Sequence, residues 1–147
     1  MKESAAPHAT PQELVTFFLD EDEYGIDVNQ VIEVNRDLIW TPVPGARPYV
    51  RGAANLRGQI VTVLDIRRIL NYEERPEDLA NTVIVVTSRN ELVGILVDRI
   101  ADVIMADQQN YGTPPKNLPE LQRRCISSVL KEQGQLIAIL NLDEALD

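Results

Sequence analysis

The 147-residue chain is long enough for one domain or two very small ones, and its formal net charge is −9. Its 44% hydrophobic and 25% charged residues are typical of a soluble globular protein. The acidic balance, the 5% aromatic content and the scarcity of adjacent basic residues argue against nucleic acid as a partner. No apolar run reaches the roughly 18 residues that span a bilayer, so direct membrane insertion is not expected.

Residues 1–12 are rich in Ala, Pro, Ser and Thr, and we interpret them as a disordered tail. This segment has no apolar h-region, so it is not a secretory signal. Cys125 is the one cysteine and cannot form an internal disulfide, which suits a reducing compartment. Together these features predict a cytoplasmic protein whose folded part spans residues 13–147.

The folded part reads as short β-strands separated by turns. Residues 14–19 (LVTFFL) and 82–87 (TVIVVT) are rich in β-branched and aromatic residues, as strands are. Residues 50–64 predict a hairpin that turns at Arg57-Gly58. Residues 65–70 and 143–146 predict helical turns, each begun by an aspartate cap.

Two ordered repeats indicate that the chain has duplicated halves. Residues 24–34 (YGIDVNQVIEV) recur as 93–103 (VGILVDRIADV), and residues 58–66 (GQIVTVLDI) recur as 134–142 (GQLIAILNL). The glycines of both pairs align, which suggests that they serve tight turns or close strand contacts. We therefore predict an all-β fold of two tandem five-stranded barrels with short helical turns, divided into subdomains at about residues 13–72 and 80–147.

The same motifs resemble the CheW family. The resemblance rests on residues 24–34, 41–44 (TPVP), 51–52 (RG), 55–67 (NLRGQIVTVLDIR) and 93–98 (VGILVD). It extends over nearly the whole chain beyond the tail. The chain departs from the family pattern at Thr62, where proline is common, and at Ala53-Ala54.

The resemblance implies two SH3-like barrels and a non-catalytic adaptor for chemotaxis signal transduction. Its implied partners are the regulatory domain of a CheA-type histidine kinase and the cytoplasmic tip of methyl-accepting chemoreceptors. The adaptor would be cytoplasmic and recruited to membrane receptor arrays.

Strand alternation and the resemblance together give a candidate receptor-binding surface. Counting by twos from Ile26 predicts inward side chains at Val28, Gln30, Ile32 and Val34, and outward ones at Val31 and Glu33. The alternatives are that Val31 is buried between the barrels or that a bulge exchanges the faces. The resemblance places Val31 and Glu33 on the receptor surface, and Ile100 and Asp102 repeat them in the second half.

Two further candidates keep a structural alternative. Arg57 is either a solvated turn residue or a receptor contact, and the family motif favours the contact. Leu38, Ile39 and Trp40 form an apolar cluster that either caps a barrel or contacts the kinase.

The sequence gives little support for catalysis. His8 is the only histidine and lies in the predicted tail, so a histidine-based catalytic site in the core is excluded. The sequence has no P-loop, no dinucleotide fingerprint and no Cys/His metal cluster, so neither a cofactor nor a metal is expected.

Three other functions stay open. A CheW-like adaptor could serve another receptor–kinase pathway, such as one for twitching motility, or the chain could be the regulatory end of a CheA-type kinase. A small-ligand barrel is disfavoured because the doubly apolar segment 60–64 suggests a filled interior.

Overall fold

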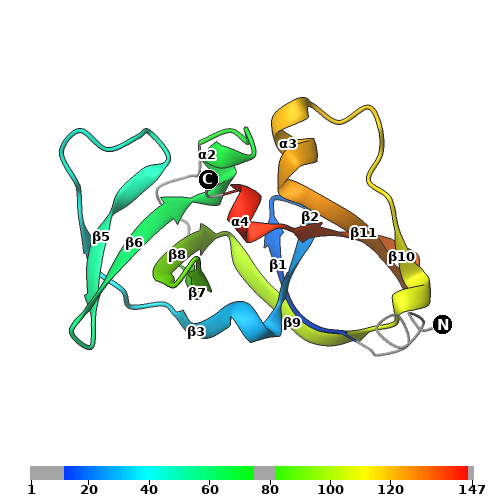
Figure 1. Cartoon of the computed structure of the whole chain (residues 1–147), viewed down its shortest axis with the longest axis horizontal. Coiled ribbons are helices and arrows are strands. Elements are labelled where there is room, and N and C mark those ends of the chain that lie inside the picture. Colours follow the sequence, from blue (N-terminus) through cyan, green and yellow to red (C-terminus); the bar gives the residue numbers. More distant parts are fainter. Residues whose placement is uncertain (1–11, 75–81, 146–147) are drawn as a thin grey trace.

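The computed structural model describes residues 12–74 and 82–145. The predicted tail lies outside the described residues except for Gln12, which begins the first strand. The described strands form two six-stranded sheets that lie side by side (Figure 1). Each sheet contains one strand of only two residues, and the other five are longer. The prediction of an all-β fold in two units is confirmed.

One sheet, which we call the terminal sheet, is built from both ends of the chain. Its strands, in spatial order, are β10 (Tyr111–Gly112), β11 (Ile126–Glu132), β12 (Gln135–Leu140), β2 (Asp22–Asp27), β1 (Gln12–Leu19) and β9 (Arg99–Ala106). The other, the central sheet, has the order β3 (Val31–Asn35), β7 (Thr82–Ser88), β8 (Glu91–Val97), β6 (Gln59–Asp65), β5 (Val50–Leu56) and β4 (Trp40–Thr41).

Short helical elements connect these strands. The 3₁₀ turns are η1 (Val28–Gln30) and η2 (Gln108–Asn110), and the helices are α2 (Ile66–Ile69), α3 (Glu120–Cys125) and α4 (Leu142–Ala145). The predicted aspartate cap is confirmed at α2, where the Asp65 side chain accepts from the Arg67 backbone N–H. At α4 the predicted aspartate cap was wrong, because the helix begins at Leu142 and Asn141, two positions before Asp143, accepts from the Glu144 N–H.

Each sheet contains strands from both halves of the chain. The terminal sheet combines β1 and β2 of the first half with β9 to β12 of the second, and the central sheet combines β3 to β6 with β7 and β8. The two halves have thus exchanged their first hairpins. Each exchanged hairpin pairs in parallel with a strand of the other half, β2 with β12 and β8 with β6.

The registers of these parallel pairs are equivalent. Gly25 lies opposite Ile139 in one pair, and Gly94 lies opposite Val63 in the other. A Cβ on Gly94 would lie 2.7 Å from Val83 Cγ1, and a Cβ on Gly25 would lie 3.2 Å from Ile139 Cδ1. Close packing therefore leaves no room for a side chain at Gly94 and little at Gly25, as expected from the repeat.

The hairpin turns of the two halves also correspond. Arg57 and Gly58 have φ values of 50° and 86°, and Gln133 and Gly134 have 49° and 80°. Two successive residues with positive φ form the two-residue hairpin loop that matches the twist of paired strands.

One apolar cluster in the described part of the chain joins the two sheets. Its largest cluster of buried side chains includes Phe17 and Ile26 of the terminal sheet together with Ile84 and Ile95 of the central sheet. Each sheet has a second, smaller cluster of its own. No helix in the described part of the chain is long and apolar enough to cross a membrane.

Candidate protein-interaction surface

Strand β3 has a different orientation from the one that strict alternation predicts. Val31 and Val34 are partly buried against the core shared by the two sheets, whereas Ile32 is 51% exposed. The prediction that Val31 faces outward and Ile32 inward was wrong. The position of Val31 agrees better with the alternative that its side chain is buried between the two units.

Two local features cause this change of phase. Residues 28–30 form the turn η1, which is capped by Asp27 accepting from the Asn29 N–H at 2.9 Å. The pairing of β3 with β7 then shifts register between Val31 and Glu33. A helical turn and a bulge each move the side chains that follow to a different face.

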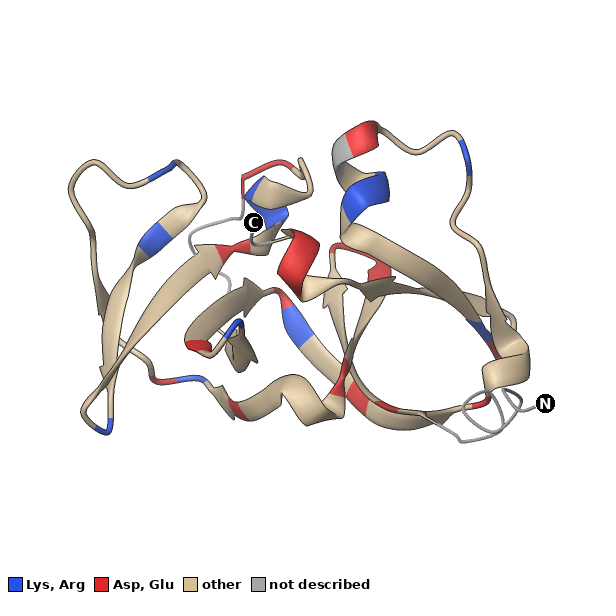
Figure 2. Cartoon of the chain, viewed as in Figure 1, with Lys and Arg blue, Asp and Glu red and all other residues tan. Residues whose placement is uncertain are grey.

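Glu33 and Arg57 lie in direct contact. Arg57 Nη1 donates to Glu33 Oε1 at 2.6 Å, and Asn35 Nδ2 donates to Glu33 Oε2 at 3.2 Å. The hydrogen bond from Arg57 lowers the pKa of Glu33 below its usual range. The Arg57 side chain is 73% exposed at the tip of the β5–β6 hairpin, the basic tip seen in Figure 2. Much of its guanidinium therefore stays accessible to a partner.

Ile100 and Asp102 lie on β9 in the terminal sheet. Ile100 packs against the same core cluster as Val31, so these two residues from different sheets contact one apolar core. Asp102 is exposed, and its backbone is tied to β1 because its N–H donates to Thr16 Oγ1 at 3.1 Å. Direct contact thus joins Glu33 with Arg57, while Asp102 makes its contacts within its own sheet.

Exposed apolar side chains on the same two strands were not identified from the sequence. Besides Ile32, they are Val103 and Met105 on β9, which are 53% and 61% exposed. The two β9 residues are spaced by two, so they project from one face of the strand. That spacing was the signal that could have identified them.

The apolar cluster before the proline-rich connector is divided. Leu38 and Trp40 pack against the smaller core of the central sheet, and Trp40 pairs with Ala54 of β5. Ile39 points away and is 85% exposed. Of the three residues, Ile39 has the side chain most accessible to a partner.

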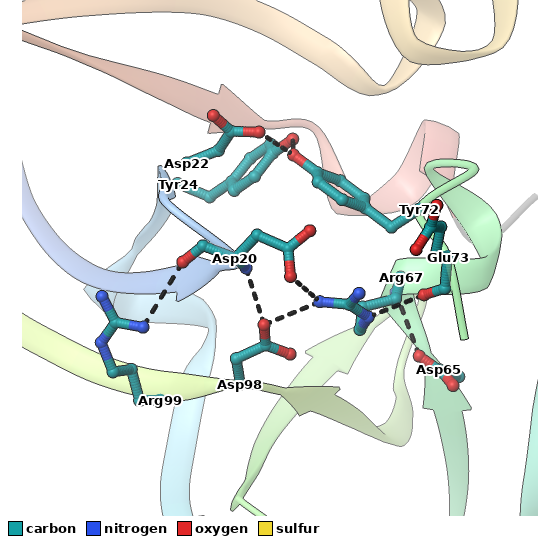
Figure 3. Close-up of polar contacts among 9 residues, drawn as sticks. All are labelled: Asp20, Asp22, Tyr24, Asp65, Arg67, Tyr72, Glu73, Asp98 and Arg99. Atoms are coloured by element: carbon teal, nitrogen blue, oxygen red, sulfur yellow. Dashed lines mark hydrogen bonds and ion pairs between the residues drawn. The ribbon is translucent and has the colours of Figure 1, made fainter. Parts of the chain in front are cut away.

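A buried polar cluster lies where the two sheets meet (Figure 3). Arg67 is 3% exposed, and its Nη1 donates to Asp20 Oδ1 at 2.7 Å and to Asp98 Oδ2 at 2.8 Å. Its Nε donates to the Glu73 carbonyl at 3.0 Å. Burial opposes the charged guanidinium, but the two carboxylates outweigh it and raise the pKa of Arg67.

A tyrosine pair lies beside this cluster. The Tyr72 hydroxyl donates to Asp22 Oδ2 at 2.6 Å and lies 2.5 Å from the Tyr24 hydroxyl. Since the proton of Tyr72 is directed to Asp22, Tyr24 is the donor between the tyrosines. Burial raises the pKa of both phenols, so both stay neutral at physiological pH.

The described residues offer no cluster of three or more His, Cys, Asp or Glu that could hold a metal ion. A sequence profile of the CheW-like domain matches residues 13–147. The chain belongs to the CheW-like family.

Individual relatives agree with this assignment. The chemotaxis protein CheW of Bacillus subtilis is 30% identical, and the match covers 94% of this chain and 88% of that protein. The crystal structure of the scaffolding protein TtCheW from Thermoanaerobacter tengcongensis matches with a TM-score of 0.86 and 27% identity, covering 93% of each chain. Protein PilI of Pseudomonas aeruginosa is 30% identical over 50% of this chain and 41% of its own length.

These findings confirm the CheW resemblance and the SH3-like, all-β fold predicted from the sequence. CheW-like proteins form an adaptor and scaffold family. The assignment of individual residues to a partner stays a prediction. The residues predicted to contact the receptor are Val31, Glu33, Arg57, Ile100 and Asp102, and those predicted to contact the kinase are Leu38, Ile39 and Trp40.

Proposed function

We propose that this CheW-like protein is a non-catalytic, cytoplasmic adaptor that couples chemoreceptors to a CheA-type histidine kinase within membrane receptor arrays. The observation that carries the proposal is the CheW-like match over residues 13–147, which is nearly the whole chain. The purified protein should bind a receptor signalling fragment and a kinase regulatory domain independently in calorimetric titrations. Binding of ATP, or phosphate incorporation into the chain, would contradict an adaptor role.

The receptor-binding surface in this proposal is formed by β3 and β9. Exposed Ile32, Val103 and Met105 supply apolar area, and the Glu33–Arg57 pair supplies a polar edge. The receptor tips implied by the family are helical hairpins, so the contact is a helix laid against these strands.

We expect Arg57→Ala and Glu33→Lys each to weaken receptor-dependent kinase activation about fivefold or more, the level at which an interface residue counts. The Arg57 side chain is 73% exposed and the Glu33 side chain is 22% exposed, and neither belongs to the apolar core, so the melting temperature should change by no more than about 2 °C. Arg47→Ala, which removes an exposed arginine between β4 and β5, is the matched control and should leave both kinase activation and the melting temperature unchanged.

Exchanging the two charges shows whether Glu33 and Arg57 contact the receptor directly or only stabilise strand β3. The double variant Glu33→Arg with Arg57→Glu keeps an internal pair but reverses what a receptor meets. Under the proposal it stays uncoupled with a normal melting temperature. Restored coupling would show that the pair acts only by supporting β3.

The kinase-binding proposal is now focused on Ile39. We expect Ile39→Ser to weaken binding of the kinase regulatory domain about fivefold, while stability changes by about 0.5 kcal/mol or less because the side chain is 85% exposed. Leu136→Ser, on the terminal sheet and 56% exposed, is the control. If Ile39→Ser leaves the kinase affinity unchanged, residues 38–40 are not part of the kinase-binding site.

The match to PilI favours one second candidate, a CheW-like adaptor of another receptor–kinase pathway such as one for twitching motility. Co-purification of the protein from its own cells, followed by identification of the receptor and kinase, distinguishes the two. The regulatory end of a CheA-type kinase would be recognised in the same experiment, as a longer polypeptide containing this sequence.

A further inference from the structure

The Arg67 cluster draws its members from both sheets. Arg67 lies on α2, directly after β6 of the central sheet. Asp20 lies in the turn between β1 and β2 of the terminal sheet. Asp98 lies between β8 and β9, where the chain passes from the central sheet to the terminal sheet. One guanidinium therefore joins a helix of one unit, a turn of the other and the crossing between them (Figure 3).

The contacts of this cluster are directional. Asp98 Oδ2 accepts from Arg67 at 2.8 Å and from the Asp20 backbone N–H at 2.6 Å, so a single carboxylate oxygen joins the helix to the turn. The planar guanidinium has a fixed arrangement of donors, which tolerates little rotation between the groups it holds. The apolar core shared by the sheets is non-directional by comparison, so it constrains their relative orientation less.

The equivalent contact in the other half is exposed to solvent. There the β7–β8 turn meets α4: Ser88 Oγ donates to Asp143 Oδ1 at 2.7 Å, and Arg89 Nη2 donates to the Asp143 carbonyl at 3.3 Å. Arg89 and Asp143 are exposed, whereas Arg67 and Asp98 are buried. Water screens charged contacts at the surface, so the buried cluster has the greater control over orientation.

We propose that Arg67 is a positioning residue that holds the two sheets at a fixed relative orientation. It thereby aligns β3 of the central sheet with β9 of the terminal sheet. The alignment matters for receptor coupling because Val31 and Glu33 lie on one strand and Ile100 and Asp102 on the other. This last step rests on the proposed function, whereas the orientation itself does not.

The test is a spin-label distance measurement on the isolated, full-length protein. Cys125 is replaced by alanine so that labels attach only at Gln59→Cys and Gln135→Cys, exposed sites that correspond in the two sheets. The distance distribution between the sheets is compared with and without the double substitution Arg67→Met and Asp98→Asn. This substitution removes both buried charges, so neither is left without its partner.

We expect the width of the inter-sheet distribution to increase at least about twofold in the double variant. A control pair within the terminal sheet, Gln135→Cys with Met105→Cys, should keep its width. Arg68→Met, on the same helix but half-exposed, should leave both distributions unchanged. An unchanged inter-sheet width, or equal broadening in the control pair, would overturn the proposal, because the first shows no positioning and the second shows local unfolding.

Arg67→Lys provides a second variant that keeps the buried positive charge. A lysine ammonium lacks the planar fork, so it should still broaden the inter-sheet distribution. A width equal to that of the unsubstituted protein would show that charge alone suffices, which contradicts the proposal. A broadened distribution with full receptor coupling would instead confirm positioning and count against the assigned receptor surface.

Discussion

Arg67→Ala should lower the free energy of unfolding by about 3–5 kcal/mol, the cost of removing one partner from a buried charge pair. The substitution leaves the Asp98 carboxylate, which is 9% exposed, without the guanidinium that now lies 2.8 Å away. It also removes the donor to the Glu73 carbonyl and the cation over the Tyr72 ring, 5.6 Å from its centroid. Urea denaturation followed by circular dichroism measures the loss.

Arg68→Ala is the matched control on the same helix. Its guanidinium is 49% exposed and lies 3.4 Å from Glu74, so its loss should change stability by about 0.5 kcal/mol or less. Equal effects of the two substitutions would show that the buried cluster contributes no more than a surface pair.

Gly52→Ala should destabilise the protein by about 1–3 kcal/mol, as overpacking of a closely packed site does. A Cβ at this position would lie 2.4 Å from the Thr41 carbonyl oxygen and 2.9 Å from Trp40 Cδ1. Because the nearest atom belongs to the backbone of β4, that strand must move away from β5. Trp40 is the only tryptophan, so its fluorescence reports the displacement directly.

Gly112→Ala is the control for this prediction. A Cβ on Gly112 would meet its nearest neighbour at 3.8 Å, an ordinary contact, so stability and fluorescence should be nearly unchanged. If Gly52→Ala leaves both the tryptophan emission and the unfolding midpoint unchanged, the close approach of β4 to β5 is not as the structure describes it.

The repeat could be predicted from the sequence because its glycines occupy equivalent, closely packed positions in both halves. Gly25 and Gly94 each face a parallel strand, and an added methyl group would press on its side chains. The exchange of hairpins could not be predicted in this way. Sequence similarity identifies which segments correspond, but it carries no information on whether a hairpin pairs within its own half or with the other.

The orientation of β3 shows a second limit. Alternation counts faces correctly only while the backbone stays extended, and η1 interrupts it between Ile26 and Val31. The motif-based assignment of Glu33 and Arg57 does not depend on that count, and the structure brings these two side chains together. Their roles toward a partner stay predictions.

The Arg67 cluster was missed for a different reason. Arg67 is separated from Asp98 by 31 positions and from Asp20 by 47, so no local pattern links them. In the sequence it reads as one of two adjacent basic residues. Only the tertiary fold, which brings α2 against the β1–β2 turn, shows that one arginine of the pair is buried and the other exposed.

Reconstitution tests whether this chain is a coupling adaptor. Kinase autophosphorylation is measured with a CheA-type kinase and receptor-containing membranes while the purified chain is titrated in. If the chain is an adaptor, the rate rises saturably only when all three components are present, and the chain alone neither binds ATP nor incorporates phosphate. Full activation by receptor and kinase without the chain, or no response at a saturating concentration of the chain despite binding to both partners, would contradict an adaptor role.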